Sequence, residues 1–72
     1  MMSRDLLAVL GDRIRRRRKL AGWTQVQLAE RIGIDRSFLA DVERGKRNIS
    51  ILNLELIAKA LKVSLSRLLT KF

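Results

Sequence analysis

Residues 24–45 decide the fold, and they read TQVQLAERIGIDRSFLADVERG. Thr24 and Gln27 have the spacing of a capping box, in which each side chain satisfies a free backbone N–H at the start of a helix. We therefore expect a short helix that begins at Thr24 and ends at Gly33, a residue that adopts the positive φ of a tight turn without a Cβ clash. Asp35 is a favourable N-cap for the next helix. Two short helices joined by such a turn predict a helix-turn-helix, with the helices at roughly 90–120° to each other.

The apolar residues of this stretch fit the same arrangement. Ala29 is small enough for the second helix to cross close to it, whereas Leu39 and Val42 are placed to anchor that helix to the rest of the domain. The other apolar members of the pattern are Leu28, Ile32 and Ile34. The alternative is an ordinary αα-hairpin inside a small bundle, and the strongly basic composition of the chain favours the helix-turn-helix.

A longer helix is expected before this stretch, from about Arg4 to Ala21, because apolar residues recur there at spacings of three and four. Gly11 weakens this helix and is a candidate for its true start. Arg17 falls on its apolar stripe, where the stem can pack while the head reaches solvent.

Two further helices are expected near the C-terminus, because Ser50 and Ser64 are each followed by apolar residues at helical spacing. The chain is therefore predicted to be all-α, with five helices in a single domain over residues 1–72. The helix-turn-helix would span about residues 25–44, and the C-terminal helices about residues 51–70.

The composition excludes several classes of function. The 72 residues include 16 Lys and Arg against 7 Asp and Glu, a net charge of +9, and they include no His, Cys or Pro. Without His or Cys the chain lacks the usual ligands of zinc sites and the usual agents of acid–base and thiol chemistry. We therefore expect no metal, no cofactor, no small-molecule ligand and no enzymatic activity. The excess of positive charge indicates a polyanionic partner.

A membrane partner is not expected, because the apolar run at residues 6–10 falls far short of the roughly 20 residues that span a bilayer. The chain is therefore expected to be cytoplasmic. A basic amphipathic surface at residues 13–19 that binds membranes or RNA is a competing hypothesis. Under it, binding would depend on residues 13–19 and would survive substitutions in residues 25–41.

One resemblance rests on motifs spread over the whole helix-turn-helix. The residues Thr24-Gln25-x-x-Leu28-Ala29, then Gly33, then Glu43-Arg44-Gly45-Lys46-Arg47 resemble the Xre/lambda-repressor-like family of prokaryotic transcription regulators. The resemblance extends from about Leu10 to Leu69 and implies a compact five-helix DNA-binding domain. A narrower similarity, to the controller proteins of restriction–modification systems, is carried by Asp35-Arg36-Ser37-Phe38, Glu43-Arg44 and Arg47-Asn48. Many phage and plasmid repressors have similar loops.

The resemblance implies that the third helix lies in the major groove of double-stranded DNA, with its N-terminal residues at base edges. Arg36, Ser37 and Asp41 match the base-reading positions. The guanidinium of Arg36 can bind guanine O6 and N7 together, although a phosphate clamp or a solvated surface arginine is the alternative. Asp41 would either accept a hydrogen bond from cytosine N4 or orient Arg36 or another cation.

Other positions are expected to hold the DNA backbone or the fold. Gln25, at the start of the second helix, would hold a phosphate. Backbone contacts that set the register are also expected in the loop after the third helix, from Arg44, Lys46, Arg47 and Asn48; the alternative there is a solvated loop. The resemblance further implies an ion pair between Arg18 and Glu43, and Arg18 is a second candidate for a phosphate contact.

The C-terminal part carries more apolar residues than one short helix pair can bury, which predicts an interface. The candidates are Leu52, Leu56, Leu65, Leu69 and Phe72. A two-fold homodimer would space two recognition helices for half-sites about one helical turn apart, roughly 34 Å, on a pseudo-palindromic operator. Packing inside the monomer or against a larger partner is the alternative.

Two further hypotheses concern partners. A regulator that activates transcription would also contact RNA polymerase. An antitoxin-type protein-interaction module is the main rival to a regulator, with DNA binding secondary to the neutralisation of a toxin. Such antitoxins usually append a segment that wraps the toxin, and no such tail is visible in the sequence.

Overall fold

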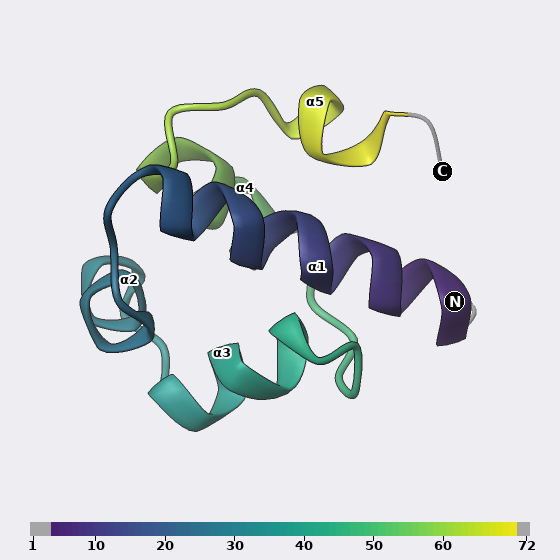
Figure 1. Cartoon of the computed structure of the whole chain (residues 1–72), viewed down its shortest axis with the longest axis horizontal. Helices are drawn as coiled ribbons and strands as arrows, with labels where there is room; N and C mark the ends of the chain where they lie inside the picture. Colours follow the sequence, from purple (N-terminus) through teal and green to yellow (C-terminus); the bar gives the residue numbers. More distant parts are fainter. Residues whose placement is uncertain (1–3, 71–72) are drawn as a thin grey trace.

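The structure is a computed structural model, and it describes residues 4–70. These residues form α-helices joined by short turns and loops, so the prediction of an all-α fold is confirmed. The helices are α1 (Arg4–Leu20), α2 (Gln25–Ile32), α3 (Arg36–Glu43), α4 (Ile51–Ala60) and α5 (Leu65–Leu69) (Figure 1). None of these five helices is both long enough and apolar enough to cross a bilayer.

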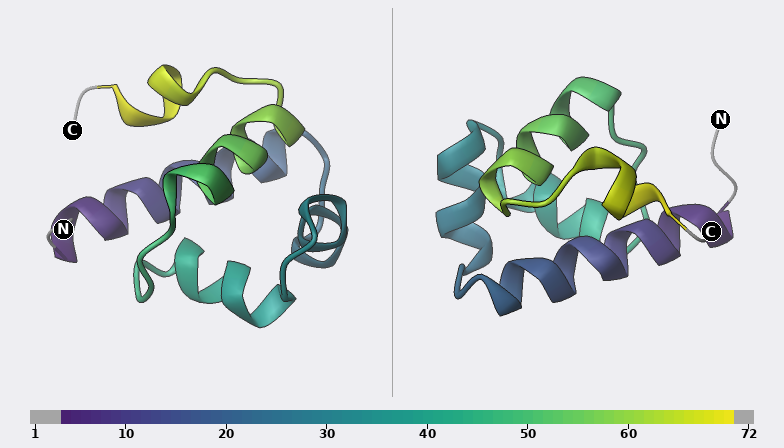
Figure 2. Two further views of the ribbon diagram at one scale, coloured as in Figure 1. Left: turned by 180° about the vertical axis from the view of Figure 1, so that it is seen from behind. Right: turned by 90° about the horizontal axis from the view of Figure 1, so that it is seen from above.

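The longest helix, α1, runs across the molecule and separates the helix-turn-helix from the C-terminal helix. In Figure 1, α3 lies on one side of α1 and α5 on the other, and α2 lies near the C-terminal end of α1. Figure 2 shows from behind that α4 covers the face of the molecule opposite α1. Helix α1 contacts both α3 and α5, and α4 contacts both α2 and α5, so the helices enclose one core.

The core is built from one apolar stripe of each helix. Its fully buried large side chains come from all five helices: Leu10, Ile14, Leu28, Leu39, Leu54, Ile57 and Leu68. Ala29 is also buried, as the close crossing of α2 and α3 requires. Because these positions recur at helical spacing in the sequence, the same periodicity that predicted the helices also predicted their inner faces.

The helix ends are determined by local side-chain chemistry. The capping box at Thr24 and Gln27 is present, with both hydrogen bonds formed. Gly33 ends α2 with a φ of 75°, which is the left-handed conformation expected for the turn. Ser50 caps α4, and its hydroxyl accepts a hydrogen bond from Asn53 N at 3.1 Å. Asp35 occupies the N-cap of α3 as expected, but its side chain makes no capping hydrogen bond.

The expectation that Gly11 marks the start of α1 was wrong, because α1 begins at Arg4 and continues through Gly11. A Cβ atom at Gly11 would lie 2.3 Å from the carbonyl oxygen of Val42 and 2.6 Å from that of Glu43. The glycine therefore allows α1 to pack directly on the backbone at the end of α3. This contact joins the helix-turn-helix to α1, and it depends on residues about thirty positions apart.

Candidate nucleic-acid interface

A buried polar network holds the helix-turn-helix against α1. The Nε of Arg18 donates to Oε2 of Glu43 at 2.7 Å, and its Nη2 donates to Oε1 at 3.0 Å. The remaining Nη1 donates to the carbonyl oxygen of Trp23 at 2.9 Å, and Nε2 of Gln25 donates to Oε1 of Glu43 at 2.9 Å. The two charged residues are only 7% and 6% exposed. Arg18 and Glu43 thus form the ion pair that the resemblance implied.

The network connects α1, the turn after it, α2 and α3 at one point. Its arginine–glutamate contact is bidentate, a geometry that combines charge with a defined orientation. No buried side-chain nitrogen or oxygen among the described residues lacks a hydrogen-bond partner. The ion pair therefore favours one docking of α3 against α1. Any arrangement that separates its two members would leave a buried charge without a partner.

Helix α3 has one buried face and one exposed end. Leu39 and Val42 lie in the core, whereas Arg36 and Ser37, in the first turn, are exposed. Within residues 4–70 the guanidinium of Arg36 has no ion-pair partner. The first turn of α3 therefore presents a free cation and a hydroxyl to solvent, while the rest of the helix is anchored.

Asp41 is held by a cation on its own helix turn. Its Oδ1 lies 2.5 Å from Nη2 of Arg44, three residues later, in an ion pair that is partly exposed. Asp41 was expected to orient Arg36 or another cation, and the structure pairs it with Arg44 and not with Arg36. This pairing also occupies Arg44, which had been expected to contact the DNA backbone.

Gln25 is the first residue of α2, and its side chain is turned toward Glu43. This contact uses one of the two amide hydrogens, so the other amide hydrogen and the carbonyl oxygen stay available. The capping box satisfies the backbone N–H of Gln27, two residues further on. Among the described residues, the backbone N–H groups of Gln25 and Val26 therefore remain available beside a side-chain amide that is fixed in position.

The loop between α3 and α4 carries exposed polar residues close to α3. Lys46, Arg47 and Asn48 are all exposed. The guanidinium carbon of Arg47 lies 5.0 Å from the centroid of the Phe38 ring, a cation–π contact that fastens the loop to α3. Sequence reasoning missed this contact, although an aromatic residue on α3 and a downstream arginine were both noted.

The expected apolar surface at the C-terminal helices is only partly present. Leu52 is 69% exposed and Leu56 is 38% exposed. Leu65 and Leu69 are both partly buried against the core, so they add less exposed apolar surface than Leu52 does. Ile51, which the sequence analysis did not name, is 62% exposed beside Leu52. The remaining candidate, Phe72, lies outside the described residues.

The sequence analysis also missed the contact that ties α1 to α5. Nη1 of Arg13 donates to the carbonyl oxygen of Leu68 at 2.8 Å and to that of Thr70. The arginine run that contains Arg13 had been considered only as a surface that binds membranes or RNA. One signal in the sequence could have indicated that Arg13 packs against another helix. Arg13 lies one helical turn before Arg17, so it shares the face of α1 on which Arg17 was noted.

Comparison with known proteins places the chain among regulators. A family model described as "Helix-turn-helix" matches residues 14–68, which include all of α2 to α4. The control protein C.SmaI of Serratia marcescens is 37% identical over 67 residues, an alignment that covers 93% of this chain and 80% of that protein.

Two solved structures share both the fold and substantial sequence identity. The restriction–modification controller protein C.AhdI from Aeromonas hydrophila has a TM-score of 0.83 and 40% identity, over 86% of this chain and 94% of that one. The master regulator for biofilm formation SinR, solved in complex with DNA, has a TM-score of 0.79 and 39% identity, over 83% of this chain and 97% of that one. At these identities the similarity covers both the fold and the sequence.

Proposed function

Because the chain belongs to the helix-turn-helix family, we propose that it is a transcription regulator that binds double-stranded DNA in a sequence-specific manner. The observation that carries the proposal is the first turn of α3, where Arg36 and Ser37 are exposed on a helix whose opposite face is buried. The similarity to SinR, which was solved in complex with DNA, supports DNA as the partner. The proposed activity is binding, without a catalytic step.

In this proposal α3 lies in the major groove and its N-terminal residues read base edges. Arg36 binds guanine O6 and N7, because an unpaired guanidinium at the helix start has both donors available. Ser37 contacts a base or a phosphate beside it. Asp41 acts through Arg44, which it holds in place by their ion pair.

The phosphates are held from both ends of the helix-turn-helix. At the start of α2, the fixed amide of Gln25 and the available N–H groups bind one phosphate. After α3, Lys46, Arg47 and Asn48 bind others, with the cation–π contact on Phe38 keeping the loop beside α3. These contacts set the position of the protein on the duplex and carry no sequence information themselves.

We further propose that two copies associate through the exposed leucines of α4, Leu52 and Leu56, extended by Ile51. A two-fold dimer would bind a pseudo-palindromic operator whose half-sites are about one helical turn apart. The similarity to the control protein C.SmaI and to C.AhdI supports a role as a restriction–modification controller. Such a role places the chain on the DNA of a prokaryotic cytoplasm, and RNA polymerase joins its partners if it activates transcription.

Selection of bound sequences from a random duplex library tests the proposal. The wild-type chain should select one half-site sequence in two copies, and Arg36→Ala should lose about 1–3 kcal/mol of discrimination at one base pair of each half-site. Lys19→Ala is a suitable control, because it removes the same charge from an exposed position of α1. An unchanged sequence preference in Arg36→Ala would show that Arg36 does not read a base.

The backbone contacts have a different signature in the same experiment. Lys46→Ala and Arg47→Ala should weaken binding to all sequences about equally, and each should reduce the salt dependence of the association constant by about one unit of slope. A change of sequence preference in either variant, with the slope unchanged, would reassign that residue to base reading.

A further inference from the structure

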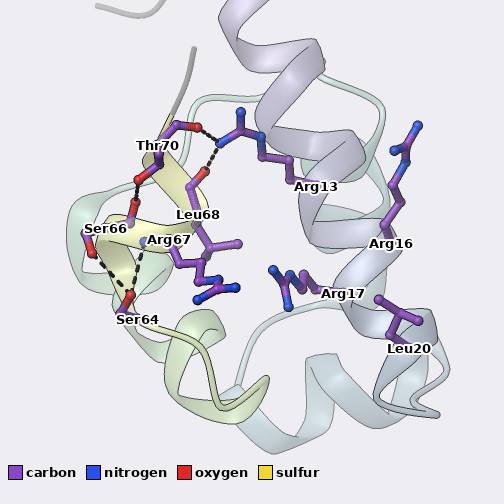
Figure 3. A pocket seen from close by; sticks show the side chains of 9 residues that line it. All are labelled: Arg13, Arg16, Arg17, Leu20, Ser64, Ser66, Arg67, Leu68 and Thr70. Atoms are coloured by element: carbon purple, nitrogen blue, oxygen red, sulfur yellow. Dashed lines mark hydrogen bonds between the residues drawn. The ribbon is translucent and has the colours of Figure 1, made fainter.

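A groove lies between α1 and α5, with a volume of about 740 Å³ (Figure 3). The wall formed by α1 contributes Arg13, Arg16 and Arg17, and the opposite wall contributes Ser64, Ser66 and Arg67. We call it the cationic groove, because four of its nine lining residues are arginines and none is acidic. A concave site of this size falls within the range of small-molecule pockets.

Two of the four arginines already have partners, and those of Arg13 hold the two walls together. Arg13 donates to the carbonyl oxygens of Leu68 and Thr70, so that α1 is tied to the end of α5. Nε of Arg16 lies 2.9 Å from Oδ2 of Asp12 in an ion pair on α1, and Figure 3 shows its side chain directed away from Arg67. These contacts shape the groove and leave its central charge to the other two arginines.

Arg17 and Arg67 carry charge that no carboxylate in residues 4–70 neutralises. Figure 3 shows their guanidinium groups pointing toward each other across the groove, one from α1 and one from α5. Two like charges that face each other without a counter-ion raise the free energy of the folded chain. A multivalent anion between them would remove this repulsion and accept hydrogen bonds from both.

The cationic groove is separate from the proposed DNA surface. Helices α3 and α5 lie on opposite sides of α1, so a duplex against α3 does not reach the groove on the same chain (Figure 1). None of the residues proposed to bind DNA lines it. Its charge is therefore available for a second anion while the operator is bound.

We propose that the cationic groove binds an oligophosphate, either inorganic or as part of a nucleotide. Guanidinium groups on opposite walls match a chain of phosphates, because each can donate two parallel hydrogen bonds to one phosphate. The hydroxyls of Ser64 and Ser66, 3.2 Å apart on the α5 side, add short polar contacts beside Arg67. A compact ligand can lie between the two walls of the groove, whereas a stiff second duplex or an extended acidic peptide favours a broader surface.

Titration of the full chain with sodium tripolyphosphate tests this assignment, with binding measured by calorimetry and by the NMR signals of the arginine Nε–H groups. We expect one tripolyphosphate per chain, with signal changes at Arg17 and Arg67. Arg17→Gln and Arg67→Gln should each weaken binding by about tenfold or more, as expected for loss of one charge-assisted contact. Lys19→Gln removes the same charge from α1 outside the groove, and it should change affinity less than about twofold.

Thermal unfolding of the same variants gives a second, independent readout. Saturating tripolyphosphate should raise the Tm of the wild-type chain by about 4 °C or more, and this rise should be absent in Arg67→Gln. Without ligand, Arg67→Gln should melt at or above the wild-type Tm, because the repulsion with Arg17 is relieved. Equal loss of binding in Lys19→Gln and Arg67→Gln would refute a defined site and indicate general attraction to a basic surface.

Titrations with other ligands distinguish the sources of the anion. Replacing tripolyphosphate with ATP tests whether a nucleoside part adds affinity, and both results are compatible with an oligophosphate site. Stronger signal changes at Arg17 and Arg67 with a glutamate-rich peptide or with a duplex of scrambled sequence would overturn the proposal in favour of a protein or a second DNA segment. The Arg36→Ala variant should bind tripolyphosphate normally, so the DNA proposal and this one fail independently.

Discussion

The most informative perturbation of this chain is Glu43→Gln, because it removes one charge from the buried network without changing the size of the side chain. The glutamate accepts three hydrogen bonds, two from Arg18 and one from Gln25. A glutamine has one acceptor oxygen for these three donors, and its amide hydrogens face donors. The guanidinium of Arg18, only 7% exposed, would stay buried without a counter-charge.

The expected loss of unfolding free energy in Glu43→Gln is large relative to the stability of so small a domain. Breaking a buried ion pair by removing one partner typically costs about 3–5 kcal/mol. A chain of 72 residues is expected to have an unfolding free energy of roughly 4–11 kcal/mol. Glu43→Gln should therefore remove roughly a quarter or more of the unfolding free energy, and it should lower the urea midpoint by about 1 M or more at a typical slope of about 1–3 kcal/mol per M.

Urea unfolding followed by circular dichroism measures this effect, and Asp41→Asn on the same helix is the matched control. The Asp41–Arg44 pair is also an acid–arginine contact, but both side chains are substantially exposed, so its loss should cost less than about 1 kcal/mol. The double variant Arg18→Met with Glu43→Gln should show a coupling of about 2 kcal/mol or more. Similar losses in Glu43→Gln and Asp41→Asn would refute the reasoning from burial.

Three other substitutions test separate features of the fold and the proposed dimer. Gly11→Ala should destabilise the chain by about 1–3 kcal/mol in thermal unfolding, because its Cβ would overlap the carbonyl oxygens at the end of α3; a neutral effect would mean that α1 can move away. Ser50→Ala should lower the unfolding free energy by about 1 kcal/mol, because a capping hydrogen bond is lost. Asp35→Ala loses no capping hydrogen bond and should lower it clearly less. Equal losses would contradict the capping geometry. In sedimentation at tens of micromolar protein, Leu52→Lys should be monomeric. The matched control is Leu20→Lys on α1, where Leu20 is 81% exposed, and this variant should stay dimeric. A dimer in both variants would show that the interface lies elsewhere.

Local chemistry explains why most of the fold was predictable. The capping box, the serine caps and the glycine that ends α2 act within a few residues, so their signals are complete in the sequence. The inner faces of the helices follow from apolar spacing for the same reason. The resemblance added the Arg18–Glu43 pair, whose members lie 25 positions apart and have no local signal.

The candidate site was predictable at its exposed positions and less so where residues compete for partners. The exposure of Arg36 and Ser37 followed from their place opposite the apolar face of α3. Asp41 forms its ion pair with Arg44, and this depends on side-chain geometry that sequence spacing alone does not determine. The partial burial of Leu65 and Leu69 could not be predicted from composition, because it results from the packing of α5 against α1 and α4.

The sequence by itself determined where the helices begin and end, which faces are apolar and that the chain is strongly basic. These properties depend on neighbours within one or two helical turns and on a sum of charges. Only the tertiary structure decided how the charges are divided. Within residues 4–70 it buries Arg18, ties Arg13 to α5, leaves Arg36 on α3 without an ion-pair partner and places Arg17 opposite Arg67. The environment of each arginine depends on packing between helices that are distant in the sequence. Every arginine carries the same charge, so the sequence does not distinguish these roles.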